Sequence, residues 1–237
     1  DSICILIDLP DPETSMKGLA FLENEAFAVQ RYAYDVFHGG LADGALEELN
    51  FRGNAFYAYR ETGGSNLDIE DDAWDSNGDR LSLERDVYPK FDLILAITNY
   101  SATAPLTAHA KTHGFRGATL HGLNKIILGS GLAVDYRQVS QDTEKLRAAM
   151  TGADCFELDF THAEENFTLV IECGRQEAQK SHGLCPRGKP DVANLPAGEV
   201  YFVPHSAQGS FPFQYEDGTI ARLEVAEGRI QEACFLT

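Results

Sequence analysis

The sequence from Ser2 to Asp8 is Ser-Ile-Cys-Ile-Leu-Ile-Asp, with five consecutive apolar residues between its polar ends. A second run, Phe91 to Ile97, is Phe-Asp-Leu-Ile-Leu-Ala-Ile. Short apolar runs rich in isoleucine are typical of strands that are covered on both faces, as in parallel sheets. These two runs therefore predict the central strands of an α/β sheet.

Strand patterns alternate with helical patterns over roughly the first 150 residues. The sequence predicts helical structure over Leu19–Leu49, Ala104–His113 and Val134–Met150, strands over Asn54–Arg60 and Gly117–Leu120, and a long acidic loop over Thr62–Asp86. We expect Gly39 and Gly40 to break the first helical stretch. This alternation predicts an α/β fold with a doubly wound, mostly parallel sheet.

The pattern changes after residue 150, where strands follow one another without helices. The expected strands or strand-rich stretches are Asp154–Phe160, Phe167–Cys173, Glu199–Pro204 and Gly218–Leu236. We therefore expect a Rossmann-like α/β domain over residues 1–150 and a β-rich part over residues 151–237.

The charge balance is strongly acidic, with 37 Asp plus Glu against 19 Lys plus Arg and a net charge of −18. Such a surface repels phosphate groups, which argues against nucleic acid and anionic membranes as partners. The five cysteines form no closely spaced pairs, which favours reduced thiols. No apolar run approaches the roughly 18 residues of a membrane span, so the predicted location is cytoplasmic.

Two short patterns match metal sites in part. Asp75, Asn77 and Asp79 are spaced like the start of a calcium loop, but Arg80 stands where that loop needs glycine. His109 and His113 lie four residues apart in an expected helix, but no glutamate follows the first histidine as in zinc peptidases. For both patterns we favour a structural role.

The segment Asn194–Pro204, with sequence Asn-Leu-Pro-Ala-Gly-Glu-Val-Tyr-Phe-Val-Pro, carries the clearest candidate. Pro196 and Gly198 predict a tight turn that delivers Glu199 to the first position of an apolar strand. A carboxylate held in this way suits metal ligation or proton transfer. The alternative, that Glu199 only caps the turn in solvent, stays open at this point.

This segment resembles the Asn-Leu-Pro-Gly-Gly-Glu-Val-Phe motif of the family M29 (aminopeptidase T) metallopeptidases. The resemblance is fair over about residues 134–237, and it implies that Glu199 is a metal ligand. The ring-cleaving 2,5-dihydroxypyridine dioxygenases are similar to that family in general fold, and the family also implies a homodimer.

The sequence departs from the family in two ways. Ala197 replaces the first glycine of the motif, and the family's remaining ligands, a second glutamate, a histidine and a His-x-Asp pair, follow in a region without a counterpart before Thr237. The chain is therefore expected to be either a fragment of a longer protein or a shortened relative without the peptidase centre.

Three functions follow from these residues and from the resemblance. The favoured one is a metal-dependent aminopeptidase-like hydrolase that uses zinc, cobalt or manganese, with Glu199 as a ligand, acting on a short peptide or another small molecule. The second is a non-heme iron(II) ring-cleaving dioxygenase, with His205 as a further ligand beside Glu199. The third is a non-catalytic α/β binding module.

Overall fold

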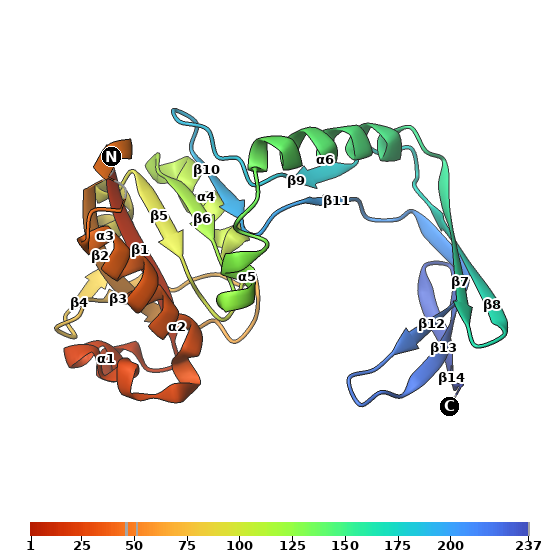
Figure 1. Cartoon of the computed structure of the whole chain (residues 1–237), viewed down its shortest axis with the longest axis horizontal. Helices are drawn as coiled ribbons and strands as arrows, with labels where there is room; N and C mark the ends of the chain where they lie inside the picture. Colours follow the sequence, from red (N-terminus) through yellow and green to blue (C-terminus); the bar gives the residue numbers. More distant parts are fainter. Residues whose placement is uncertain (46, 51, 237) are drawn as a thin grey trace. The chain divides into compact units, whose positions relative to one another are not determined.

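A computed structural model of the chain describes residues 1–45, 47–50 and 52–236 (Figure 1). These residues form two compact units. The first unit comprises Asp1–Ser140 and His182–Gly198, and the second comprises Gln141–Ser181 and Glu199–Thr237. The expected division has one boundary near residue 150, whereas these units are interleaved along the chain. The reason is that the segment after residue 181 returns to the first sheet as strand β10 (Asp191–Asn194).

A seven-stranded sheet, in the order β10-β6-β5-β1-β2-β3-β4, forms the centre of the first unit. Besides β10, its strands are β1 (Ser2–Leu9), β2 (Arg52–Arg60), β3 (Asp72–Trp74), β4 (Arg80–Ser82), β5 (Leu93–Ala96) and β6 (Arg116–Thr119). The strands from β10 to β2 pair in parallel, and β3 and β4 add in antiparallel orientation. The sheet grows from β1 to one side through β2 and to the other through β5, which confirms the predicted doubly wound, mostly parallel sheet.

Strand β1 lies in the interior of this sheet and is buried on both faces. Every residue from Ile3 to Ile7 is 0% exposed. Cys4 and Leu6 belong to one hydrophobic cluster, and Ile5 and Ile7 belong to another. Because successive side chains of a strand point to opposite faces, burial of both faces explains a run without any polar position.

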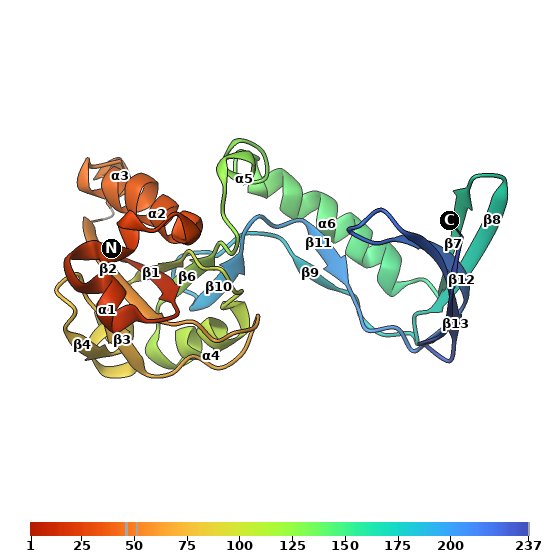
Figure 2. The same cartoon turned by 90° about the horizontal axis from the view of Figure 1, so that it is seen from below.

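Helical segments cover both faces of the sheet (Figure 2). Between β1 and β2 the chain forms α1 (Pro12–Met16), η1 (Lys17–Glu23), η2 (Glu25–Phe27), α2 (Ala28–Tyr32), η3 (Ala33–His38), α3 (Gly39–Ala42) and η4 (Glu47–Leu49), where η marks 3-10 and π segments. The opposite face is covered by α4 (Thr103–His113), and α5 (Lys125–Gly129) follows β6. The expected break at Gly39 and Gly40 is wrong, because both residues lie inside α3 and Gly39 has helical dihedral angles.

The acidic stretch Thr62–Asp86 is not the long loop that the sequence predicts. It contains β3 and β4 and the start of η5 (Leu83–Val87), which η6 (Tyr88–Lys90) follows. Ala73 and Trp74, both in β3, are buried. The prediction was wrong because three-residue strands are too short to produce a recognisable periodicity, so pairing with β2 decides their conformation.

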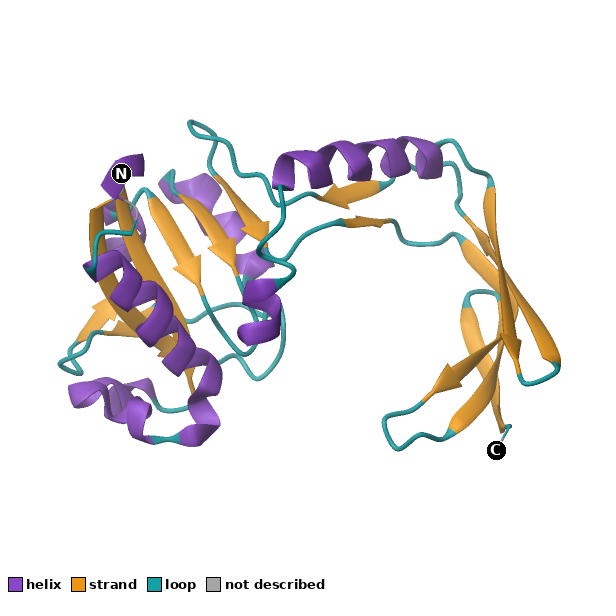
Figure 3. Ribbon diagram, in the orientation of Figure 1, coloured by secondary structure: helices purple, strands orange, loops and turns teal. Residues whose placement is uncertain are grey.

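The second unit consists mainly of antiparallel strands (Figure 3). Its five-stranded sheet has the order β14-β13-β12-β8-β7, with β7 (Cys155–His162), β8 (Glu165–Glu172), β12 (Ser206–Gln214), β13 (Ile220–Ala226) and β14 (Arg229–Phe235). A two-stranded ribbon pairs β9 (Gln179–Ser181) with β11 (Glu199–Tyr201), and α6 (Tyr136–Thr151) contributes its residues from Gln141 onward. The predicted β-rich part is thus confirmed. Over the described ranges, no helix is both long and apolar enough to cross a membrane.

Candidate functional site

The turn before Glu199 begins at the carboxyl end of β10. Leu195 N donates to Thr119 O (2.8 Å), which continues the pairing of β10 with β6 by one residue. Gly198 then takes a positive φ of 131°. Strand β11 begins at Glu199, so the prediction that the turn delivers this residue to the first position of a strand is confirmed.

Close packing in the first unit fixes the conformation of this turn. A Cβ atom on Gly183 would lie 2.3 Å from Tyr136 Cδ1 and 3.1 Å from Ala197 Cβ. A Cβ atom on Gly131 would lie 2.8 Å from Pro196 Cβ. The glycines at these two positions therefore make room for the Pro196–Ala197 turn.

Strand β11 is held in place through its partner β9. Glu199 lies opposite Ser181 in the ribbon. The neighbouring Lys180 Nζ lies 2.7 Å from Glu144 Oε2 on α6. Hydrogen bonds from Arg147 and Lys180 lower the pKa of Glu144 to about 2. The ion pairs on α6 thus position the strand on which Glu199 lies, although the Glu199 side chain itself is exposed.

His205 lies just before β12, on the five-stranded sheet and not on the ribbon. Its backbone N donates to Glu172 O (2.8 Å), and the ring of Phe202 stacks on that of Phe156 with centroids 5.9 Å apart. The side chain of His205 is exposed. The connection from β11 to β12 is therefore attached to the sheet on both sides of Val203 and Pro204.

The described residues do not form a complete metal site around these two candidates. Within residues 1–45, 47–50 and 52–236, no group of three or more His, Cys, Asp or Glu side chains is placed to hold a metal ion. A catalytic metal takes about three protein ligands. Glu199 and His205 together fall short of that number, so the donor set present here does not by itself fit a catalytic metal.

The two weaker metal patterns have structural contacts. The rings of His109 and His113 pack on Tyr88, with centroids 4.8 and 5.5 Å from its ring. Burial lowers the pKa of His109. Asp75 Oδ1 accepts hydrogen bonds from the backbone N of Asn77 (2.9 Å) and of Asp79 (3.0 Å) and so closes its own turn.

A buried carboxylate that the sequence analysis did not single out lies at the carboxyl end of β1. Asp8 is 0% exposed and accepts hydrogen bonds from Gln30 Nε2 (2.8 Å), Asn99 N (2.9 Å) and Tyr100 N (3.1 Å). Burial raises the pKa of Asp8, and these hydrogen bonds oppose the shift. Asp8 thus fixes the loop between β5 and α4, at the edge where open α/β sheets bind ligands. Its signal in the sequence is a charged residue directly after a wholly apolar run.

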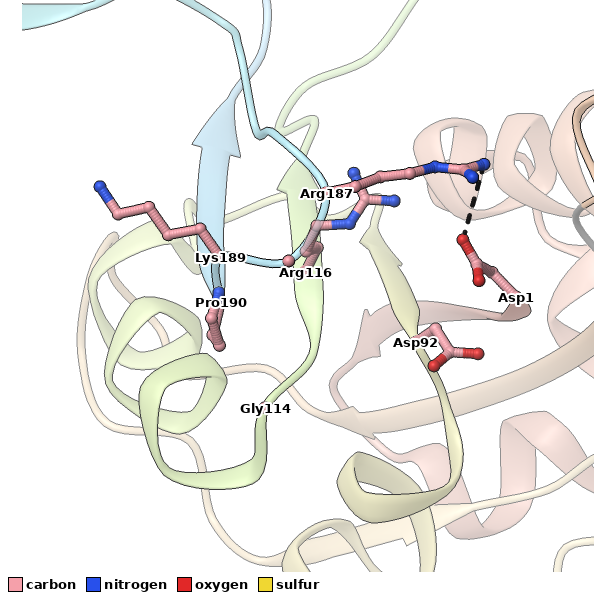
Figure 4. A pocket seen from close by; sticks show the side chains of 8 residues that line it. Asp1, Asp92, Gly114, Arg116, Arg187, Lys189 and Pro190 are labelled. Atoms are coloured by element: carbon pink, nitrogen blue, oxygen red, sulfur yellow. Dashed lines mark ion pairs between the residues drawn. The ribbon is translucent and has the colours of Figure 1, made fainter.

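The opposite, amino edge of the sheet carries a pocket of about 280 Å³ whose walls hold both signs of charge (Figure 4). Arg187 Nη2 lies 3.6 Å from Asp1 Oδ2, and Arg116 Nη1 donates to Cys185 O (2.8 Å). Asp92 accepts from Ser2 N (2.7 Å), and this hydrogen bond is the main cause of its lowered pKa. These contacts tie the ends of the strands together.

Comparison with known proteins gives one informative likeness. No protein-family profile and no curated protein sequence matches the chain. The structure is similar to that of 2,5-dihydroxypyridine dioxygenase from Pseudomonas putida KT2440, with a TM-score of 0.58 and 14% sequence identity. The likeness covers 100% of this chain and 63% of the dioxygenase. The chain therefore has the α/β fold of a large part of that enzyme, whereas these comparisons do not show the M29 family that the sequence resembles.

Proposed function

We propose that this chain belongs to a metal-dependent enzyme of the ring-cleaving dioxygenase type, and that Glu199 is one of its metal ligands. The observation that carries the proposal is the shared fold, which extends over the whole chain, with a TM-score of 0.58 to the 2,5-dihydroxypyridine dioxygenase. The turn that delivers Glu199 to the start of β11 supports its role as a fixed carboxylate.

The proposed metal is iron(II), which non-heme oxygenases bind through histidine and carboxylate side chains. Iron(II), if held there, would supply the capacity to bind and activate O₂. Glu199 offers an exposed carboxylate on a strand anchored through Lys180 and Glu144, and His205 offers an imidazole on the adjoining connection. Any further ligand would come from outside the described residues.

An aminopeptidase-like hydrolase is the second candidate, and the Asn194–Pro204 motif favours it. The two candidates differ in their metal, because hydrolysis uses zinc, cobalt or manganese whereas ring cleavage uses iron(II). In both, Glu199 would have the same role as a ligand.

The test begins with elemental analysis of the protein purified without oxygen. The dioxygenase proposal predicts stoichiometric iron, and it predicts O₂ uptake with loss of the ring absorbance when 2,5-dihydroxypyridine is added. Zinc, cobalt or manganese with release of amino acids from short peptides would favour the hydrolase. Absence of any bound metal, with neither activity, would overturn both and leave the non-catalytic binding module.

The role of Glu199 is tested by comparing Glu199→Gln with Glu157→Gln, since both replace an exposed carboxylate on a strand of the second unit. We expect Glu199→Gln to weaken metal binding by at least about tenfold, with an unchanged melting temperature. Equal metal affinity in the two variants would remove Glu199 from the site.

A further inference from the structure

A pocket of about 350 Å³ lies beside the outer edge of β2, within the first unit. On this edge, the described pairing joins β3 to Ala58 and Tyr59 of β2. After Trp74 the chain turns away from the sheet, because Asp75 N donates to Asp79 O (3.1 Å) and not to β2. The ladder between β2 and β3 therefore opens next to Phe56, and the pocket fills the opening. Its volume is in the range of small-molecule sites.

One wall of the pocket is aromatic. Tyr34 and His38, four residues apart on η3, stack with their ring centroids 4.7 Å apart and their planes at 14°. Phe56 of β2 lies edge-on to both rings, at 5.3 Å from each. Phe21 also stacks on Phe56, with ring centroids 6.0 Å apart, and so helps to hold the ring of Phe56 in position. Rings fixed in this way offer flat surfaces to a further ring.

The backbone around the pocket is held in an unusual conformation. Leu19, which lines the pocket, has φ 58° and ψ 38°, in the left-handed region that residues with a branched side chain rarely adopt. The preceding residue, Gly18, donates its N–H to Ser76 O (3.1 Å) and so ties this segment to the turn opposite. Such strain persists where the surroundings enforce it, and it clusters at ligand sites.

The lining of the pocket also carries a negative charge. Asp75 is the carboxylate among the described lining residues, and they include no lysine or arginine. Its oxygens accept from Asn77 N, Asn77 Nδ2 and Asp79 N. An ionised carboxylate has about four acceptor positions, so Asp75 can accept one more hydrogen bond. The hydrogen bonds within the turn also keep this carboxylate from swinging away from the pocket.

We propose that this pocket binds a small aromatic amine. The ring of the ligand packs against Tyr34, His38 and Phe56, and its ammonium group pairs with Asp75. A cation is also the ligand that a chain of net charge −18 attracts. All of its described lining residues belong to the first unit, and the proposal does not depend on the proposed metal.

Calorimetric titration of the whole chain with three probes tests the chemistry of the ligand. Phenethylamine has both ring and charge, 2-phenylethanol keeps the ring without the charge, and butylamine keeps the charge without the ring. We expect phenethylamine to bind with a dissociation constant of about 1 mM or lower, and each of the other two to bind about tenfold or more weakly. Absence of phenethylamine binding, or equal binding of all three, would overturn the proposal.

A pair of variants locates the site. Asp75→Asn removes the charge but keeps a side-chain oxygen for the turn, and Asp79→Asn removes the same charge from the same turn without touching the lining. We expect Asp75→Asn to weaken phenethylamine binding about tenfold and Asp79→Asn to leave it within about twofold. Equal effects of the two variants would show that the amine responds to general charge and not to this pocket.

Discussion

The first and second units differ in how far the side chains of their strands are buried. In β1 of the first unit, every residue from Ile3 to Ile7 is 0% exposed. In β14 of the second unit, Ile230 is 60% exposed and Phe235 is 78% exposed. The first sheet has helices on both faces, whereas the described part of the second unit contains one long helix and an antiparallel sheet.

Because of this difference, the first unit provides more of the stability of the chain, whereas the candidate metal ligands lie in the second unit. Burial of apolar surface stabilises a fold by about 25 cal/mol per Å², so the first unit gains more from each strand. Glu199 and His205 belong to the second unit, where fewer apolar side chains are buried. Regions with few buried contacts open at lower free energy than the core.

The strongest test of this comparison is to remove the same kind of side chain from each sheet. Leu6→Ala in β1 should lower the free energy of unfolding by about 3–5 kcal/mol, since it leaves a cavity in a close-packed core. Ile230→Ala in β14 should lower it by less than about 1 kcal/mol, because its side chain is largely exposed. Urea unfolding followed by circular dichroism measures both.

Fluorescence of Trp74, the single tryptophan, reports on the first unit by itself. Ile230→Ala should leave its urea midpoint unchanged. Similar losses in the free energy of unfolding for Leu6→Ala and Ile230→Ala would contradict the comparison.

The next largest effect concerns the buried carboxylate of the first unit. Asp8→Ala leaves the backbone N–H groups of Asn99 and Tyr100 without their acceptor, while Gln30 Nε2 keeps its hydrogen bond to the backbone O of residue 8. We therefore expect a loss of about 2–4 kcal/mol in unfolding free energy. The exposed Asp11→Ala serves as the control, with an expected change within about 0.5 kcal/mol. A loss for Asp8→Ala no larger than that of the control would show that the cluster is not a structural anchor.

The loss for Asp8→Ala should also depend on pH. Because the pKa of Asp8 is raised in the fold, its contribution to stability is complete below the unfolded pKa of about 3.9 and declines as the pH rises through the folded pKa. The difference in unfolding free energy between wild type and Asp8→Ala should therefore be larger at acidic pH than at neutral pH. A difference that grows with pH would mean that the hydrogen bonds outweigh the burial.

The sequence could predict the elements that have local causes, but not those that depend on long-range pairing. The run Ser2–Asp8 predicted β1 because burial on both faces leaves its mark residue by residue. The turn at Pro196 and Gly198 predicted the start of β11 because proline and glycine restrict the backbone locally. Strand β10 was not predicted, since Asp191–Asn194 has no distinctive pattern and is a strand only through its pairing with β6.

The candidate sites divide in the same way. Glu199 could be found from the turn before it. The Asp8 cluster could not, because its donors Asn99 and Tyr100 lie 91 and 92 residues away in the chain. The pocket at Asp75 was missed for a similar reason, as it arises where the ladder between β2 and β3 opens.

A smaller effect is expected where the first unit packs around the turn before Glu199. Gly183→Ala would place a Cβ atom 2.3 Å from Tyr136 Cδ1. We expect the free energy of unfolding to fall by about 1–3 kcal/mol as the ring of Tyr136 moves to make room. Gly188→Ala is the matched control, because Gly188 also has a positive φ (79°) but its Cβ would meet nothing within 4 Å. Thermal unfolding of both variants separates the clash from the backbone strain that they share. Equal losses would show that the Tyr136 contact does not matter.

The smallest expected effect is a change in the pKa of Glu144, whose polar contacts in the second unit are exposed, unlike those of Asp8 in the first. Hydrogen bonds from Arg147 and Lys180 lower the pKa of Glu144 to about 2. The pairing therefore contributes above the ordinary glutamate pKa of about 4.3 and is lost as the pH falls through the folded value. Lys180→Ala should raise the pKa of Glu144, measured by NMR titration of its carboxyl carbon. Lys145→Ala removes the same charge from a side chain that pairs with Asp142, so it should leave that pKa nearly unchanged. If both variants raised the pKa of Glu144 equally, the general charge of the surface would set that pKa, and not the contact between α6 and β9. The strand that carries Glu199 would then have to be held in place by other contacts.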